Sequence, residues 1–162
     1  MSRRWARIVD ALPVRAPGDA AALCDAVAEH LGKPIRLLPV PFPPDAPCGL
    51  VITTAEAHYV AYDNTTGPLH QRHIIAHELG HLLAGHASSE DAALLMPTID
   101  PTVVRSVLAR TPGYGAAAER EAEQIAGLLW RRTAAWAGEA TWSVDPAAEG
   151  VVDRIRRSLG GD

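Results

Sequence analysis

The feature that most constrains this chain is a single H-E-x-x-H motif formed by His77, Glu78 and His81. Two histidines four positions apart lie about 40° from each other around an α-helix, so both imidazoles can reach one cation. Glu78 projects beside them, where it can take a proton from a metal-bound water rather than bind the metal itself. The motif therefore predicts a helix that binds zinc through the two histidines, with Glu78 as the general base.

The residues around the motif indicate a helix with one buried face. When the first motif histidine is the zero of a helical wheel, Ile75, Leu79 and Leu82 fall on the opposite side, at roughly 140–200°. The alternative is an ordinary amphipathic helix with two histidines, which would leave Glu78 without a role. We expect this metal-binding helix to occupy residues 67–87.

A catalytic zinc usually takes three protein ligands and leaves a fourth position for water, so a third ligand is needed. The extended motif H-E-x-x-H-x-x-G-x-x-H would need a glycine and a histidine where the chain has Ala84 and Ala87. The other source is a later helix, expected at 115–138. His73 lies one turn before the motif and is expected to hydrogen-bond at the site without binding metal. His86 is interpreted as structural.

Helix geometry separates the three glutamates that open this later helix. Relative to Glu119, Glu123 lies at about 40° and Glu121 at about 200°, while the apolar residues of the same helix lie at roughly 240–300°. Glu119 is therefore the predicted third ligand, and Glu123 is the predicted carboxylate that holds a histidine N–H and fixes its tautomer. Glu121 is expected to point away. An acidic helix start favoured by the helix dipole is the alternative.

The rest of the chain predicts an α+β fold: a small β-sheet or hairpin packed against a helical bundle that carries the H-E-x-x-H helix. Helices are expected at 3–12 and 19–31, an edge strand at 34–40, and a hairpin from 49–54 and 58–63. The hairpin either presents an exposed edge beside the site, where an extended peptide could pair, or only covers the core.

Three further helices are expected, at 88–95, 101–110 and 145–160. The glycine-rich break at 111–115 is a candidate hinge near the site. Residues expected to cap helices are Asp19, Gly32 and Thr66.

The chain has 162 residues, which predicts one domain over 1–162, with N-terminal helices at 1–33 and a sheet region at 34–66. The formal net charge is −4, so we expect no direct binding of nucleic acid. No stretch approaches the roughly 20 apolar residues that span a bilayer, so a soluble, cytoplasmic protein without membrane contact is expected. Cys24 and Cys48 are expected to be reduced.

The chain resembles the ImmA/IrrE family of zinc metallopeptidases over about residues 45–130, including the hairpin and the helix entry at 67–69, and most clearly in two segments. Residues 72–86, RHIIAHELGHLLAGH, are similar to the metal-binding helix of that family, and residues 119–126, EREAEQIA, are similar to its E-x-E-A-[ND]-x-F-A helix. In this likeness Glu119 stands at the first glutamate of the second motif. The chain departs from the family at His73, where phenylalanine is usual, and at Glu123, which replaces Asn or Asp.

The resemblance implies a cytoplasmic, zinc-dependent endopeptidase whose protein substrate is a separately encoded helix-turn-helix transcriptional repressor. In such an enzyme zinc lowers the pKa of its bound water to about 7, and Glu78 carries the proton to the leaving amine. Tyr114 and His58 are candidates for stabilising the transition state. The alternative from another class is a protease-like sensor module that sequesters a regulator without cleavage, although such a binder has no need of Glu78.

Overall fold

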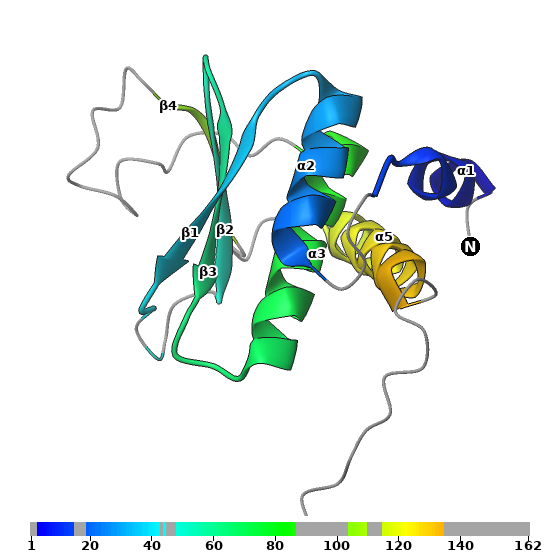
Figure 1. Ribbon diagram of the computed structural model, residues 1–162. Coiled ribbons are helices and arrows are strands. Elements are labelled where there is room, and N and C mark those ends of the chain that lie inside the picture. Colours follow the sequence, from blue (N-terminus) through cyan, green and yellow to red (C-terminus); the bar gives the residue numbers. More distant parts are fainter. Residues whose placement is uncertain are drawn as a thin grey trace, which may run out of the picture.

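The computed structural model describes the backbone of 104–109 and the residues 3–14, 19–42, 44, 48–86 and 115–134. Within these ranges the chain forms an α+β fold, with the labelled helices on one side of a β-sheet (Figure 1). The predicted fold class is confirmed at this level. The helices expected at 88–95 and 145–160, the residue Tyr114 and most of the break at 111–115 lie outside the described residues.

Four strands form the described sheet, in the order β1-β3-β2-β4. Their bounds are β1 (Ile35–Val40), β2 (Gly49–Thr54), β3 (His58–Asp63) and β4 (Val104–Ala109). The predicted hairpin is confirmed as the antiparallel pair β2–β3, and β1 lies at one edge, parallel to β3. Both hairpin strands have a neighbour on each side, so the hairpin itself presents no open edge. The outer strands of the described sheet are β1 and β4.

Strand β4 corrects the prediction of a helix at 101–110. Its residues pair antiparallel with β2, for example Leu108 with Val51. The local pattern of apolar residues fits one face of a helix, but β-branched valines also favour strands. Pairing along β2 satisfies backbone N–H and C=O groups of that strand, which local sequence cannot reveal. Tertiary pairing therefore overrode the local signal.

The described helices are α1 (Arg3–Ala11), α2 (Ala20–Leu31), α3 (Pro68–Ala84) and α5 (Ala116–Ala134). The caps of α2 are confirmed: the Asp19 carboxylate accepts the Ala21 N–H at 2.9 Å, and Gly32 adopts a left-handed φ of 68°. The cap predicted for α3 is wrong, because the residue at that position is Gly67 and not Thr66. The proline after Gly67 instead starts α3 with its φ already close to the helical value.

The main core lies between the helices and one face of the sheet. Helix α3 contacts α2, α5, β2 and β3, and α1 packs against α5 on the side away from the sheet (Figure 1). The predicted buried face of α3 is confirmed, since Ile75, Leu79 and Leu82 are all buried. The apolar face of α5 is buried too, and both Ile125 and Leu129 are fully enclosed. These two faces meet and fix how α5 lies on α3.

The closest approach of α3 and α5 is at Gly80. A Cβ atom added there would lie 2.5 Å from the carbonyl oxygen of Ala122, far inside normal contact distance. Only glycine lets the two backbones come this near without displacement. Because Gly80 precedes His81 and Ala122 follows Glu119 by three residues, this contact brings the start of α5 to the face of α3 that carries the two motif histidines.

The described residues can be examined for membrane-spanning helices and for the state of the two cysteines. In the part of the chain that the structure describes, no helix combines the length and apolar character needed to cross a bilayer. Cys24 and Cys48 form no disulfide with each other, as predicted. Burial, reinforced by the nearby Asp25 carboxylate, raises the pKa of the Cys24 thiol to about 12.

Candidate metal centre

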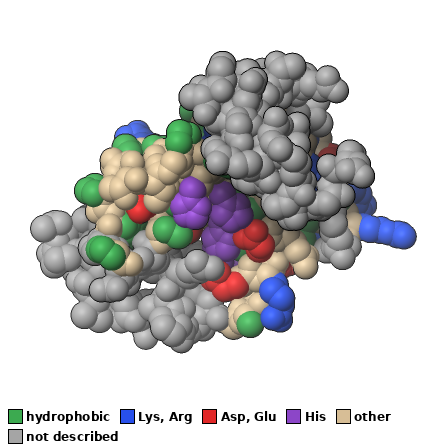
Figure 2. All heavy atoms as spheres, turned by 90° about the horizontal axis from the view of Figure 1, so that it is seen from below, with side chains coloured by type: hydrophobic (Ala, Val, Ile, Leu, Met, Phe, Trp, Pro, Cys, Tyr) green, Lys and Arg blue, Asp and Glu red, His purple; other side chains and the backbone are tan. Residues whose placement is uncertain are grey.

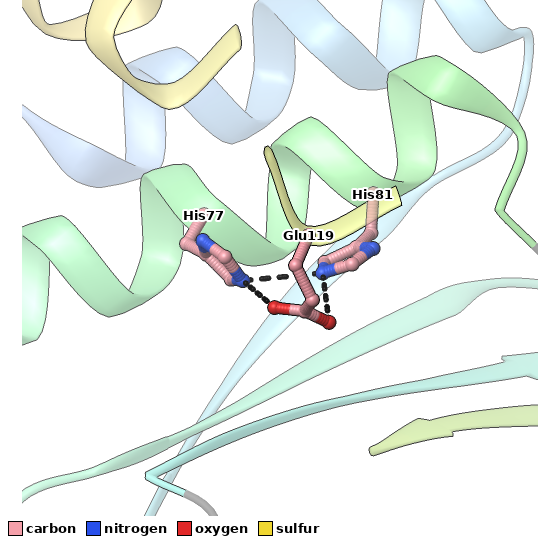
Figure 3. A group of neighbouring side chains, drawn as sticks. All are labelled: His77, His81 and Glu119. Atoms are coloured by element: carbon pink, nitrogen blue, oxygen red, sulfur yellow. Dashed lines mark hydrogen bonds and ion pairs between the residues drawn. The ribbon is translucent and has the colours of Figure 1, made fainter. Parts of the chain in front are cut away.

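Three potential ligand atoms converge between α3 and the first turn of α5 (Figure 3). The Nε2 atoms of His77 and His81 are 3.1 Å apart. The Glu119 carboxylate faces both rings, with Oε2 3.4 Å from His77 Nε2 and Oε1 3.6 Å from His81 Nε2. The structure therefore brings together the three residues predicted as ligands, from segments about forty positions apart in the sequence.

The spacing of these atoms fits zinc. Ligands held at about 2.0–2.1 Å in a tetrahedron are separated from each other by about 3.3–3.4 Å. The Nε2 atoms of His77 and His81, 3.1 Å apart, and the 3.4 Å from His77 Nε2 to Glu119 Oε2 lie close to that edge length, while His81 Nε2 is 3.6 Å from the other carboxylate oxygen, Oε1. Two imidazoles and one carboxylate are also a ligand set that catalytic zinc uses in peptidases. The donor set and its spacing are thus suited to the metal that the resemblance implies.

The contact made by His77 Nδ1, the ring nitrogen that faces away from the centre, also supports a zinc site here. His77 Nδ1 lies 3.2 Å from Glu123 Oε2, and a carboxylate can only accept a hydrogen bond. The hydrogen of the neutral ring therefore sits on Nδ1, which leaves the Nε2 lone pair facing the centre. Glu123 occupies the place predicted for it. His73 approaches the same carboxylate oxygen at 3.6 Å, so it contacts the predicted partner of a ligand and not the centre.

Two residues near His81 have contacts that the sequence interpretation missed. His86 Nδ1 lies 3.0 Å from His81 Nδ1, and Glu121 Oε2 lies 3.1 Å from His86 Nε2. Glu121 was expected to point away from the site, and His86 was interpreted as structural. The Gly85 cap, with a φ of 70°, turns the chain back so that His86 faces His81. A glycine followed by histidine at a helix end is the signal that could have found this contact.

The second oxygen of Glu121 accepts a hydrogen bond from Trp5 Nε1 at 2.7 Å. This bond is the largest cause that holds the pKa of Glu121 below its ordinary value, and the hydrogen bond and charge of His86 add to it. The wheel of α5 places Glu121 on the opposite side of the helix from Glu119. What it lacked was α1, which packs on that side of α5 and supplies the indole.

Glu78 lies on α3 between the two candidate ligand histidines and is buried, with 6% of its surface exposed. Its carboxylate rests against the backbone of Gly49 at the start of β2, where an added Cβ atom would lie 2.5 Å from Glu78 Oε1. A cavity of about 110 Å³ opens next to it. The residues lining this cavity are Cys48, Gly49, His70, His73, Ile74, His77, Glu78 and Glu123.

Glu78 and His77 line the same cavity. Figure 2 shows histidine and acidic side chains next to one another on one face of the molecule. A cavity next to His77 and Glu78 is what a catalytic site requires and a closed structural metal site does not.

Of the two candidates for stabilising the transition state, only His58 lies within the described residues. It pairs with Thr53 across the hairpin, and its Nδ1 atom lies 2.8 Å from the Thr53 hydroxyl. Gly49, the residue that touches Glu78, pairs with Tyr62, four positions further along β3. That separation is about 13 Å along a strand, so the structure does not bring His58 to Glu78.

Comparisons of the chain with protein-family models, curated proteins and solved structures found no match. The likeness to ImmA/IrrE metallopeptidases therefore rests on the sequence of residues 45–130, above all on the motifs at 72–86 and 119–126. The geometry of the centre stands independently of that likeness, since it follows from the positions of the side chains.

Proposed function

We propose that this protein is a zinc-dependent endopeptidase with an α+β fold in which the sheet packs against the helix that carries the H-E-x-x-H motif. His77, His81 and Glu119 hold the metal, and Glu78 is the general base. The observation that carries this proposal is the convergence of two imidazole nitrogens and a carboxylate beside a buried glutamate at an open cavity. A site that only stored or sensed zinc would have no use for Glu78 in this place.

When bound, zinc would supply a lowered water pKa, about 7, and polarisation of the scissile carbonyl. The residues of the chain do the remaining work. Glu78 accepts the proton of the attacking water and returns it to the amine that leaves. The protein surroundings of Glu78 shield it from bulk water, and Gly49 leaves room for its carboxylate. Glu123 holds the ring of His77 in the orientation that the metal needs.

The substrate is proposed from the resemblance. A protein of this kind would act in the cytoplasm on one specific protein, a separately encoded helix-turn-helix repressor. The cavity beside Glu78 is about 110 Å³, enough for one side chain of an extended peptide and too small for a folded domain. The substrate would therefore present a flexible segment to the site.

The first test measures the metal in protein purified without added metal. Mass spectrometry should find one zinc per chain in the wild type, and the Glu119→Ala variant should lose it. Glu56→Ala is the matched control, because Glu56 is an exposed glutamate in the hairpin turn, away from the centre. A wild type that binds no zinc even when it is supplied, or an Glu119→Ala variant that keeps it, contradicts the proposed site.

The second test concerns Glu78. The Glu78→Gln variant should keep its zinc and lose peptide cleavage by a factor of about 10²–10⁴, the range for removal of a general base. Cleavage is followed by mass spectrometry on a mixture of unfolded peptides and on candidate repressors. Zinc-loaded wild type that binds a repressor yet cuts neither probe would show a sequestering module, and a Glu78→Gln variant that cuts at the wild-type rate would remove Glu78 from the mechanism.

A further inference from the structure

A chain of three hydrogen bonds connects the N-terminal helix to one of the candidate metal ligands. The Trp5 indole N–H donates to Glu121 Oε1 at 2.7 Å. Glu121 Oε2 lies 3.1 Å from His86 Nε2, and His86 Nδ1 lies 3.0 Å from His81 Nδ1. Each member comes from a different part of the fold: α1, α5, the turn after α3, and α3 itself.

When both imidazole rings are neutral, the chemistry of the groups fixes the direction of every bond. A carboxylate only accepts, so the hydrogen of the His86 ring lies on Nε2, towards Glu121. His86 Nδ1 then carries a lone pair and accepts from His81. The hydrogen of the His81 ring therefore lies on Nδ1, and its Nε2 lone pair faces His77 and Glu119. This is the tautomer that a metal ligand must have.

The backbone holds His86 in place for this role. Its N–H donates to the carbonyl oxygen of His81 at 3.1 Å, within the left-handed cap at Gly85. Trp5 at the other end is buried, with 3% of its surface exposed, so the indole has a fixed position. Both ends of this series of hydrogen bonds, Trp5 and His86, are held in place by contacts that do not depend on a metal.

We propose that Trp5, Glu121 and His86 are positioning residues that fix the tautomer and orientation of His81. This inference rests on the metal-binding part of the proposed function and assigns helix α1 a role in the centre. His77 Nδ1 contacts the carboxylate of Glu123 on α5. The two candidate ligand histidines are therefore oriented by different carboxylates, Glu123 for His77 and Glu121, through His86, for His81. Metal binding would thereby depend on the docking of α1, more than sixty residues before the motif.

The Glu121→Gln substitution tests the direction of the chain. The indole is a donor only, so the amide oxygen of the new glutamine must face Trp5. The amide NH₂ group then faces His86 Nε2, which must become an acceptor. His86 shifts its hydrogen to Nδ1, and His81 must accept there and carry its own hydrogen on Nε2. That places a hydrogen on the nitrogen that should bind the metal.

Removing the indole N–H should reverse this effect. In the Trp5→Phe/Glu121→Gln double variant the amide can rotate, so that its oxygen accepts from His86 as the carboxylate did. The wild-type tautomer of His81 should return. A merely structural role for these residues predicts the opposite, because losing a buried tryptophan contact adds damage and repairs nothing.

The experiment has two readouts. In the metal-free protein at mildly alkaline pH, two-bond ¹H–¹⁵N spectra of the imidazole rings should show hydrogen on Nδ1 of His81 in the wild type. They should show it on Nε2 in Glu121→Gln and again on Nδ1 in the double variant. In a zinc competition titration, Glu121→Gln should bind zinc at least about tenfold more weakly, and the double variant should recover part of the loss.

Two results would overturn the inference. One is a His81 tautomer that is the same in the wild type and in Glu121→Gln, and the other is a double variant that binds zinc no more tightly than Glu121→Gln. Thermal melts of all variants establish that each is folded. The tautomer readout uses no metal and no substrate, so it stands or fails separately from peptidase activity and from the zinc content of the wild type.

Discussion

Replacing Gly80 with alanine tests whether the close approach of α3 and α5 builds the metal centre. The added Cβ would lie 2.5 Å from the carbonyl oxygen of Ala122, whereas ordinary contact begins at 3.4 Å. The difference is 0.9 Å, and the three nearest atoms are all backbone atoms of Ala122, so no side chain can rotate to make room. We therefore expect α5 to move away from α3 by a distance of this order.

Gly127→Ala is the matched control for this substitution. Gly127 lies inside α5, and the nearest heavy atom to its added Cβ is 4.0 Å away. Both substitutions gain about 1 kcal/mol in helix propensity, but only Gly80→Ala adds an overpacking cost of about 1–3 kcal/mol. The difference between the two variants isolates that cost. It corresponds to a melting temperature about 2–12 °C lower for Gly80→Ala, at roughly 2–4 °C per kcal/mol.

The effect on the metal should exceed the effect on stability. Metal sites tolerate ligand distances that deviate by only about 0.2 Å, so a shift near 0.9 Å would remove Glu119 from the coordination sphere. We expect zinc affinity to fall at least about tenfold in Gly80→Ala and to stay unchanged in Gly127→Ala. Calorimetric melts and a chelator competition titration measure the two effects. If Gly80→Ala binds zinc as the wild type does and melts with the control, the close approach does not position Glu119.

Two further predictions concern the sheet. Gly49→Ala should displace the Glu78 carboxylate, because the new Cβ would lie 2.5 Å from its Oε1. The variant should keep its zinc and cleave peptides more slowly. Unchanged cleavage would show that this contact does not position Glu78. Burial first, and the charge of Lys33 second, hold the pKa of His58 below its ordinary value of 6.5. The stability that depends on neutral His58 is therefore present above pH 6.5 and lost as the pH falls. The melting temperature should drop less between about pH 7.5 and about pH 5.5 in His58→Gln than in the wild type. Equal drops in the two proteins would refute this.

The motif helix could be predicted from the sequence because its information is local. A spacing of four puts His77 and His81 on one face, and the apolar residues between them put the core on the other, whatever the rest of the chain does. The caps of α2 at Asp19 and Gly32 could be predicted for the same reason. Each of these features depends on residues within one or two turns.

Strand β4 shows the opposite case. The residues at 104–109 carry a pattern that fits a helix, and the structure pairs them with β2, which precedes them by some fifty positions. The sequence at 104–109 does not indicate that one side of β2 is open for pairing. Where propensity is balanced, the partner decides the conformation, and the partner is a property of the whole fold.

In the candidate centre, too, some features follow from local sequence and others from tertiary packing. The sequence by itself determined the chemical identity of the centre: two imidazoles, a base beside them, and a choice among three glutamates narrowed by the angle each makes around α5. Only the tertiary structure decided what the outward-facing nitrogen of His81 contacts. Glu121 and His86 meet because a left-handed cap turns the chain back at Gly85, and Trp5 reaches them because α1 packs on α5. Hydrogen bonds between distant segments require both partners to be placed within about 3 Å, and only the packing of helices on one another sets that distance.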